Sequence, residues 1–424
     1  MAFTGEDLSN FDLALKYFYP TVDVVSDIDN RVPFLKTIEG RPERPTAGKS
    51  LTATWAAQTG RNLGWDDLTE NGDFATPRKG TYKNWSLSPA HVNAGFEVSG
   101  HLEAAGTRKD ANFFEELADK FAMETKKTVT LLLGILIMLD GTANIGTILS
   151  IATHTITMDT GNIANVELGM RLTIRDTASG GSEQLTSSQP ASGTVTSVDK
   201  PNNKFTVTDA TGAAAGDVIA IYEFYGATLP NGIRNMIGNS GTFQGLNRAT
   251  AGNEFASSPI RSDTGAYGDS MLIQTAHDVL KFSVDSDPSA DWLAITDFDS
   301  TRWFYLTKQD QVRYTSDTKK IIGGYDTVGL STGGGGTVNL TADPRAWPGE
   351  TFFMRPKDFS VLRPTSGLVS GWVENGTGGH LFQKTGSAAN GVYADAHQGW
   401  WVERRNYCND KPRNSARLTG YRSI

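Results

Sequence analysis

The chain has 424 residues, which is enough for two or three domains and a large buried core. Hydrophobic residues make up 38% of it and charged residues 20%, values that exclude global disorder. The net charge is -8, from 39 Lys and Arg against 47 Asp and Glu, and the lack of any basic run argues against sequence-specific recognition of DNA or RNA. A single cysteine, Cys408, excludes an intrachain disulfide framework and a cysteine-rich zinc site.

No targeting or membrane-spanning segment is expected. Residues 1–10 are polar and acidic and lack the basic and apolar regions of a secretory signal, so we expect synthesis and folding in a cytoplasm. The longest apolar stretch, Val129–Leu139, has 11 residues, whereas a helix needs about 20 to span a bilayer. The 45 glycines fall mainly between short β-branched and aromatic runs, which predicts many strands and turns.

The chain opens with a pattern typical of a short amphipathic helix. Ser9 begins a capping box, and Phe11, Leu15 and Phe18 follow at helical spacing before Pro20 ends the pattern.

The next segments are predicted to hold little core of their own. Residues 32–47 contain three prolines among charged residues, which favours an extended arm over a packed element. Ser50–Ala57 and Tyr82–Val98 carry β-formers and tryptophans, and the turn dipeptide Asn71–Gly72 lies between them. These residues predict a long two-stranded excursion.

The clearest helix is predicted over Ala111–Leu139, where apolar residues recur at steps of three, four or seven. It would be roughly 44 Å long at about 1.5 Å per residue. Its first half is amphipathic, whereas its second half, from Val129, is apolar on all sides. We therefore expect the second half to be buried.

The rest of the chain is mostly strand-like. Residues 147–225 alternate short β-runs with turns, which predicts a small closed β-barrel. A helix is predicted at Asp269–Phe282 from the spacing of its apolar residues. A flexible loop is predicted at Gly333–Gly336, and further strands at Thr351–Ile424.

Motifs for nucleotides and calcium are incomplete. Ala47–Ser50 ends like a phosphate-binding loop, but Glu43 stands where that motif needs its first glycine. Gly376–Gly378 begins like a dinucleotide fingerprint that fails at Leu381, so we interpret both segments as turns. Two acidic clusters break the calcium-loop pattern and are interpreted as solvated loops: Asp27, Asp29 and Asn30, and Asp285, Asp287 and Asp291.

Catalytic signals are equally weak. None of the six histidines lies in an HExxH motif or has another at i, i+4: His91, His101, His154, His277, His380 and His397. His277 is expected to face solvent or contact its own helix, Cys408 lacks a nucleophile's setting, and no GxSxG motif occurs. We therefore predict no catalytic, cofactor-binding or metal-binding residue, no cofactor and no enzyme activity.

In chain order the predicted elements are an arm, a two-stranded excursion, a long spine helix, a β-barrel, a helical α/β region and a β-rich end. The segments that carry this order are Ala111–Leu139, Leu229–Met236, Asp269–Phe282, Ile321–Tyr325, Trp401–Arg405 and Ala416–Gly420. The order resembles the major capsid (coat) proteins of tailed bacteriophages, an α+β shell fold shared with herpesviruses.

The resemblance spans nearly the whole chain and implies a domain plan. It implies an N-terminal arm at 1–49, an extended loop at 50–100, a peripheral domain with the spine helix at 101–146, an inserted β-barrel domain at 147–225, an axial domain at 227–345, and the C-terminal β region of the peripheral domain at 346–424.

The resemblance also implies a function and partners. The chain would be a structural subunit that self-assembles, as pentamers and hexamers, into the icosahedral shell of a double-stranded DNA phage. It would act in the virion after synthesis in the host cytoplasm, enclose DNA without sequence-specific binding, and need no membrane. A separate scaffolding protein is implied because the arm starts almost at once, together with a portal protein and room for a decoration protein. The alternatives are a phage tail or baseplate protein and a β-rich carbohydrate-active enzyme or binding module.

Some shells of this family join neighbouring subunits by an isopeptide bond between lysine and asparagine. The candidate residues here are Lys79 and Lys83 on the excursion, Asn375 and Asn390 in the C-terminal region, and Glu374 as a base. Both asparagines precede a glycine, which a hairpin turn explains, and the surroundings of Lys79 are charged and solvated. We therefore predict a shell held by non-covalent contacts.

Overall fold

The computed structural model describes residues 33–39, 41, 43–45, 52–60, 79–99, 111–175, 193–224, 227–282, 292–308, 328–331, 337–364, 370–373, 382–385 and 393–421. Several sequence predictions lie outside these residues: the helix at 9–18, the motif at 47–50, both acidic clusters, the segment 321–325 and the glycine run at 333–336.

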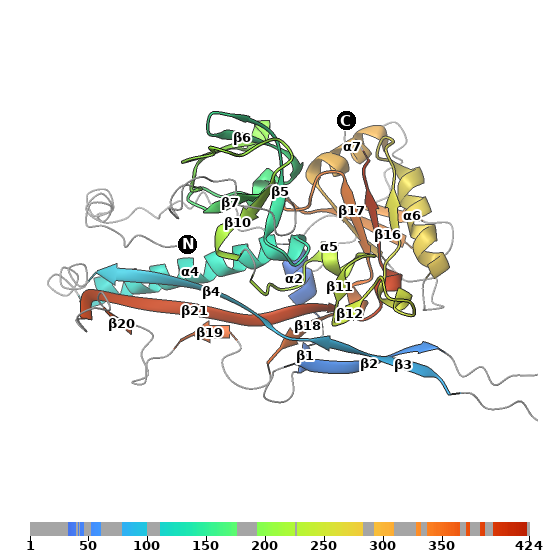
Figure 1. Ribbon diagram of the computed structural model, residues 1–424, viewed down its shortest axis with the longest axis horizontal. Coiled ribbons are helices and arrows are strands. Elements are labelled where there is room, and N and C mark those ends of the chain that lie inside the picture. The colour runs from blue at the N-terminus through green and yellow to red at the C-terminus, as the bar shows by residue number, and fades with distance from the viewer. Residues whose placement is uncertain are drawn as a thin grey trace, which may run out of the picture.

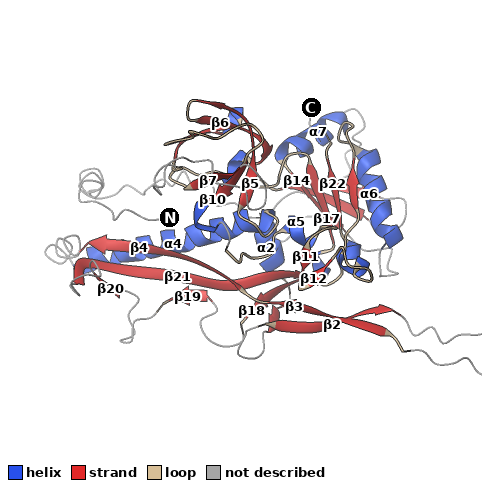
Figure 2. Cartoon of the chain, viewed as in Figure 1, coloured by secondary structure: helices blue, strands red, loops and turns tan. Residues whose placement is uncertain are grey.

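Helix α4 (Ala111–Met138) forms the spine of an α+β molecule, as the apolar spacing predicted (Figures 1 and 2). Strand β4 (Ala90–Ser99) pairs antiparallel with the long strand β21 (Tyr393–Asn409), and both run along this helix. The same sheet contains β1 (Glu43–Pro45), β18 (Phe359–Arg363), β19 (Ser370–Trp372) and β20 (Phe382–Thr385).

The apolar half of α4 is buried as expected, at Val129 and then without interruption from Leu133 onward. Every residue from Leu133 to Leu139 is buried, whereas Leu131 and Leu132 stay partly exposed. The chain passes very close to the end of this helix, because a Cβ on Gly232 would lie 1.9 Å from the carbonyl oxygen of Leu139. Only glycine fits there.

A six-stranded antiparallel sheet follows α4 in the order β7-β10-β5-β6-β9-β8. Its two outer strands meet through a bridge between Arg171 and Thr194, and the amide of Leu172 donates to the Gly193 carbonyl at 2.9 Å, so the sheet closes on itself. The strands are β5 (Asn144–Ala152), β6 (Thr155–Gly161), β7 (Leu172–Arg175), β8 (Val195–Asp199), β9 (Lys204–Val207) and β10 (Val218–Ile221). The predicted barrel strands are present, and the predicted start at 147 falls inside β5.

A third sheet, also of six strands, has the order β13-β22-β17-β14-β16-β15. Its strands are β13 (Ile260–Ser262), β14 (Trp292–Thr296), β15 (Val328–Ser331), β16 (Thr337–Ala342), β17 (Glu350–Met354) and β22 (Ala416–Thr419). The predicted helix α6 (Asp269–Phe282) is confirmed, and it packs against β22 through buried residues such as Leu272 and Val279. Since β17 and β22 come from the C-terminal region, the predicted boundary near 345 separates strands that pair.

The remaining helices and strands are short. They are α5 (Ile233–Met236), α7 (Phe298–Lys308), β11 (Thr242–Phe243) and β12 (Leu246–Asn247), with 3-10 helices at Ile163–Asn165, Lys200–Asn202, Tyr222–Phe224, Glu254–Ala256, Pro356–Asp358 and Pro412–Asn414. None of the helices in the described ranges is long and apolar enough to cross a membrane.

The prediction that residues 32–47 form an extended arm is wrong for their first half. Residues Pro33–Glu39 form helix α2, and its side chains Phe34, Leu35 and Ile38 are almost fully buried in the main core. Proline fits the first turn of a helix, where no amide partner is needed, so Pro33 starts this helix rather than preventing it. Of the residues described in this segment, Glu43–Pro45 form the extended strand β1.

The two-stranded excursion is present, with different bounds. Strands β2 (Ala53–Gly60) and β3 (Thr81–Leu87) pair only with each other among the described strands. The single strand predicted over Tyr82–Val98 is instead β3 and β4, which belong to different sheets and are separated at Ser88 and Pro89. Proline cannot donate to a strand ladder, which explains the break.

Candidate functional site: the projecting strand pair and its anchors

The β2–β3 pair projects from the body of the molecule (Figure 1). Tyr82, at the outer end of β3, has 63% of its surface exposed, whereas Trp85, three residues further along, has 1%. Exposure thus falls steeply toward the base. A two-stranded ribbon is marginally stable in water by itself, so the outer part of this pair depends on its anchored base or on another surface.

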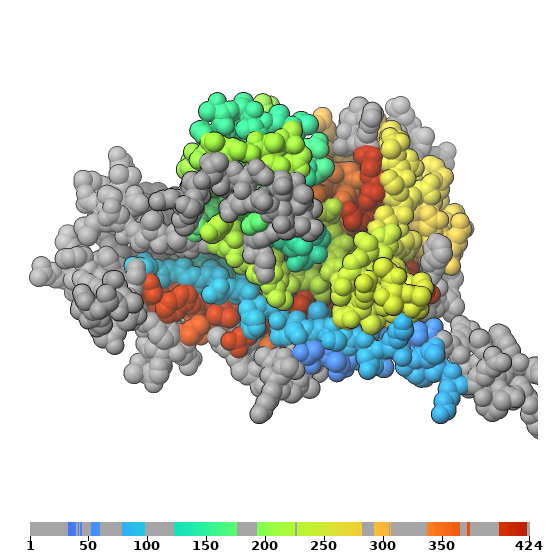
Figure 3. Space-filling model, in the orientation of Figure 1, coloured from blue at the N-terminus to red at the C-terminus, as the bar shows by residue number. Residues whose placement is uncertain are grey.

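The main anchor of the strand pair is Trp85. Its indole meets Phe243 and Phe255 edge-on, with ring centroids 6.0 and 5.0 Å apart. Beside it, the backbone amide of Ser86 donates to the carbonyl of Gln244 at 2.9 Å. Figure 3 shows the blue atoms of this pair lying against the yellow-green atoms of the same region. The base of the excursion is therefore docked on the β11–β12 turn of its own chain.

A polar contact adds to this anchor. The Lys83 ammonium donates to Oδ1 of Asn253, and Nδ2 of Asn253 donates to the carbonyl of Asn247 at 2.6 Å. Of the residues considered for a covalent bond, Lys79 is exposed at the start of the described excursion, and Asn375, Asn390 and Glu374 lie outside the described residues. The structure thus places Lys83 beside an asparagine that sequence reasoning did not consider.

The other side of the base rests on the sheet along α4. Ala53 of β2 packs with Leu362 and Cys408, and the guanidinium of Arg44 lies 4.5 Å from the ring centroid of Trp55. Burial raises the pKa of the Cys408 thiol to about 12, so the thiol stays protonated near neutral pH. The structure thus places Cys408 as a packing residue at the base of the strand pair.

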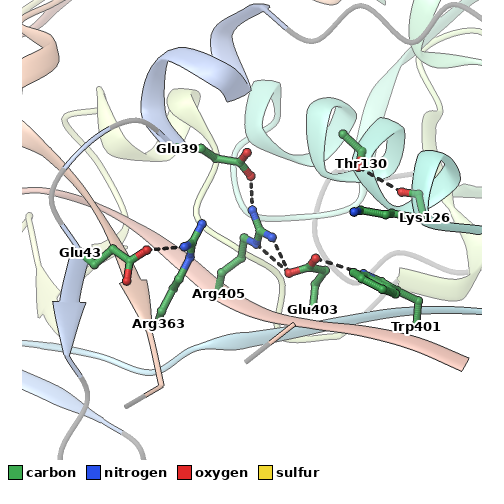
Figure 4. A network of polar contacts seen from close by, with 8 residues as sticks. All are labelled: Glu39, Glu43, Lys126, Thr130, Arg363, Trp401, Glu403 and Arg405. Carbon is green, nitrogen blue, oxygen red and sulfur yellow. Dashed lines mark hydrogen bonds and ion pairs between the residues drawn. The ribbon is translucent and has the colours of Figure 1, made fainter. Parts of the chain in front are cut away.

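A polar network ties helix α2 to strand β21 beside α4 (Figure 4). Arg405 of β21 binds the carboxylates of both Glu39, on α2, and Glu403, and the indole of Trp401 donates to Glu403 at 3.0 Å. The ammonium of Lys126 on α4 lies 5.3 Å from the Trp401 ring centroid. Because Arg405 is almost buried between two carboxylates, α2 is fixed to the long strand by a charge pair that is costly to break.

The remaining sequence candidates do not converge on a site. His91 and His277 are exposed, and His154 accepts a hydrogen bond from the Ala210 amide at 3.1 Å. Within the described ranges, no group of three His, Cys, Asp or Glu side chains could hold a metal ion. The side chains of His101, His380 and His397 are not described.

Sequence reasoning missed the 242–256 segment that receives the excursion. The sequence of this segment gives little indication of a buried contact, because Phe243 and Phe255 are isolated apolar residues among glycines and polar residues. The turn is shaped by two residues with positive φ, Gln244 at 47° and Gly245 at 80°. Of these two residue types, only glycine commonly indicates a positive φ when it is seen in a sequence.

No family model matches the sequence, and no curated protein matches it significantly. Among solved structures, the chain is similar to one from the capsid asymmetric unit of cyanophage A-1(L), at 12% identity and a TM-score of 0.45, over 92% of this chain and 96% of that one. It is similar to the capsid of an empty GTA particle at 8% identity and a TM-score of 0.46, over 95% of both chains. A third similarity, at 10% identity and a TM-score of 0.43, is to the holo-SrpI encapsulin complex from Synechococcus elongatus PCC 7942, over 99% of this chain and 96% of that one.

Proposed function

We propose that this chain is a structural shell subunit, the major capsid protein of a double-stranded DNA phage. The proposal combines the sequence resemblance with the arrangement of its own elements. A projecting strand pair, a long spine helix and two further sheets follow one another in the order that the resemblance implies.

The observation that carries the proposal is the β2–β3 pair. It leaves the body as a two-stranded ribbon, and its outer residue Tyr82 has 63% of its surface exposed. An exposed aromatic side chain on such a ribbon does not stabilise an isolated monomer. A ribbon of this kind gains burial when it lies on a neighbouring copy. When the same contact is repeated under rotational symmetry, subunits form closed rings, and rings of five and of six subunits together form a closed shell.

The finer assignments rest on the resemblance. Under the proposal, the subunits form pentamers and hexamers, a separate scaffolding protein guides assembly, a portal protein occupies one position, and the outer surface leaves room for a decoration protein. The closed sheet built from β5 to β10 is the inserted domain, and the shell encloses DNA in the virion without sequence-specific contacts. A chain of net charge -8 fits an inner wall that does not grip phosphate.

The deciding experiment is electron microscopy of the chain, expressed alone and together with a candidate scaffolding protein. Closed shells of uniform size are expected. The matched control is Tyr82→Asp, which leaves the fold intact but places a charge on the outer part of the ribbon, and should reduce shells to free subunits or small rings. Tubes or discs would favour a tail or baseplate protein, and a monomer at every concentration would contradict the proposal.

A further inference from the structure

A groove of about 410 Å³ lies between α4, β4 and the closed sheet. The helix contributes Leu131, Leu132 and Ile135, strand β10 contributes Ile221, and the turn before β7 contributes Met170. Its lining is thus mainly apolar, and its size is that of a site which holds several side chains. Leu131 and Leu132 are the last residues of the apolar half of α4 that the molecule leaves partly exposed.

Three carboxylates line the groove, and all three have partners: two pair with arginines, and Glu97 accepts a hydrogen bond from Gln398 Nε2 at 3.0 Å. Glu167 lies 3.9 Å from the guanidinium of Arg345, and Glu223 lies 3.6 Å from that of Arg171. A cationic ligand would have to compete with these existing contacts. Because Leu168, next to the edge, is 68% exposed, the apolar surface continues out of the groove. The groove therefore suits an apolar occupant.

We propose that residues 9–18 of the same chain occupy this groove as an amphipathic helix. Phe11, Leu15 and Phe18 recur at i, i+4 and i+7, which places three large apolar side chains on one face. A helix of this length is unstable alone in water and needs a surface that covers its apolar face. The segment lies outside the described residues, and the groove offers apolar surface without a described occupant.

The tether allows this placement. Residues 19–32 connect the segment to α2, and an extended chain of that length reaches roughly 46 Å. Helix α2 packs against α4, and α4, with 28 residues, is roughly 42 Å long. The segment can therefore reach any point along α4 of its own chain. Because it is tethered to that chain, its effective concentration at the groove is higher there than at the groove of a second free subunit.

The first test is amide hydrogen exchange on the full-length free subunit. Amides of residues 12–18 should exchange slowly, and Leu15→Glu should speed their exchange roughly tenfold or more, since burying one such side chain is worth about that factor. The matched control is Lys16→Glu, on the other face of the predicted helix, which should leave the exchange unchanged. Equal exchange in all three proteins, or an equal effect of both variants, would overturn the proposal.

The second test identifies the surface. A photoreactive amino acid at position 15 of the full-length subunit should cross-link within one chain to residues 128–135 of α4 or 167–170 beside the closed sheet. The same group at position 16 should give few such products. Cross-links to other regions, or only between two chains, would overturn the assignment. Both tests use free subunits, so their result does not depend on whether shells form.

Discussion

The indole of Trp85 on β3 meets the ring of Phe255 edge-on, with centroids 5.0 Å apart and planes at 66°. This contact, together with Phe243, holds a projecting strand pair on a segment far away in the sequence. The excursion is thus an element with an anchored base and an exposed outer part, and the two parts should respond differently to mutation and to assembly.

Trp85→Ala should lower the free energy of unfolding by about 3 to 5 kcal/mol, because it removes a fully buried aromatic side chain and leaves a cavity. Thermal or urea unfolding of the free subunit measures the change. Tyr82→Ala is the control on the same strand. Because Tyr82 is largely exposed, the free energy of unfolding of this variant should stay within about 0.5 kcal/mol of the wild-type value. Similar losses in both variants would show that Trp85 is not the anchor.

Hydrogen exchange should divide the excursion in two. In the free subunit, the Ser86 amide, bonded to Gln244, and the β4 amides, paired with β21, should exchange slowly. Residues 57–60 and 81–83, toward the outer end, should exchange quickly and become protected only in the assembled shell. Exchange that is the same along β3 in the free subunit, or unchanged on assembly, would contradict this division.

Leu136→Asp should abolish soluble folding, whereas Leu132→Asp should reduce stability less. Leu136 has 1% of its surface exposed inside the main core, so an aspartate there would be an unpaired buried charge. Leu132 only packs against that core from the groove. Soluble yield and thermal melting measure both variants, and an equal loss would mean that the groove is closed in solution.

The long periodic elements could be predicted from the sequence. Helices α4 and α6 were predicted almost to the residue, because many apolar residues repeat along them. The barrel strands were predicted because turn residues separate them. Helix α2 was missed, since three prolines outweighed the apolar residues Phe34, Leu35 and Ile38. A seven-residue helix has too few turns to show a period.

Long-range pairing could not be predicted in the same way. Nothing local in Glu350–Met354 or Ala416–Thr419 indicates that these strands join the sheet of β14 rather than that of β21. Which sheet a strand joins depends on partners far away in the sequence, such as Ile260 of β13 for Arg417 of β22. The anchor on Phe243 and Phe255 is of the same kind, because it exists only once β3 lies across the β11–β12 turn.

Residues 143–224, expressed alone, should fold into a β-rich unit with a cooperative melting transition, because their sheet closes on itself. Circular dichroism on heating measures this. Gly161→Ala in the fragment is the control: a Cβ there would lie 2.1 Å from the Ile145 carbonyl oxygen, at a φ of +98°, so the fragment should lose its structure. A disordered wild-type fragment would show that the sheet needs its contact with the 344–346 loop, where Asn162 donates to the Pro344 carbonyl at 2.9 Å.

The last prediction concerns covalent bonds in the assembled particle. An isopeptide bond requires a lysine nitrogen with a free electron pair that attacks the amide carbon of asparagine and releases ammonia. In this structure Lys83 Nζ donates a hydrogen bond to Oδ1 of Asn253, which is the contact of a polar anchor between two side chains. The nearby carboxylate of Glu254 is exposed to solvent, and its pKa is lowered, first by the hydrogen bond from the Gly252 amide and further by the charge of Lys83. Glu254 is therefore a solvated carboxylate and not the desolvated base that such a reaction needs.

We therefore expect particles boiled in detergent to release one band near 45.8 kDa, with an intact mass equal to that of the sequence. The two readouts separate two reactions. A ladder of larger bands would reveal bonds between subunits, and a single band lighter by one ammonia would reveal a bond between Lys83 and Asn253 within one subunit. Lys83→Arg is the matched control, because it keeps the charge and the hydrogen bond but cannot form the amide, and its particles should behave like the wild type. Either anomalous product, lost in that variant, would show that the contact is a reacting pair rather than an anchor.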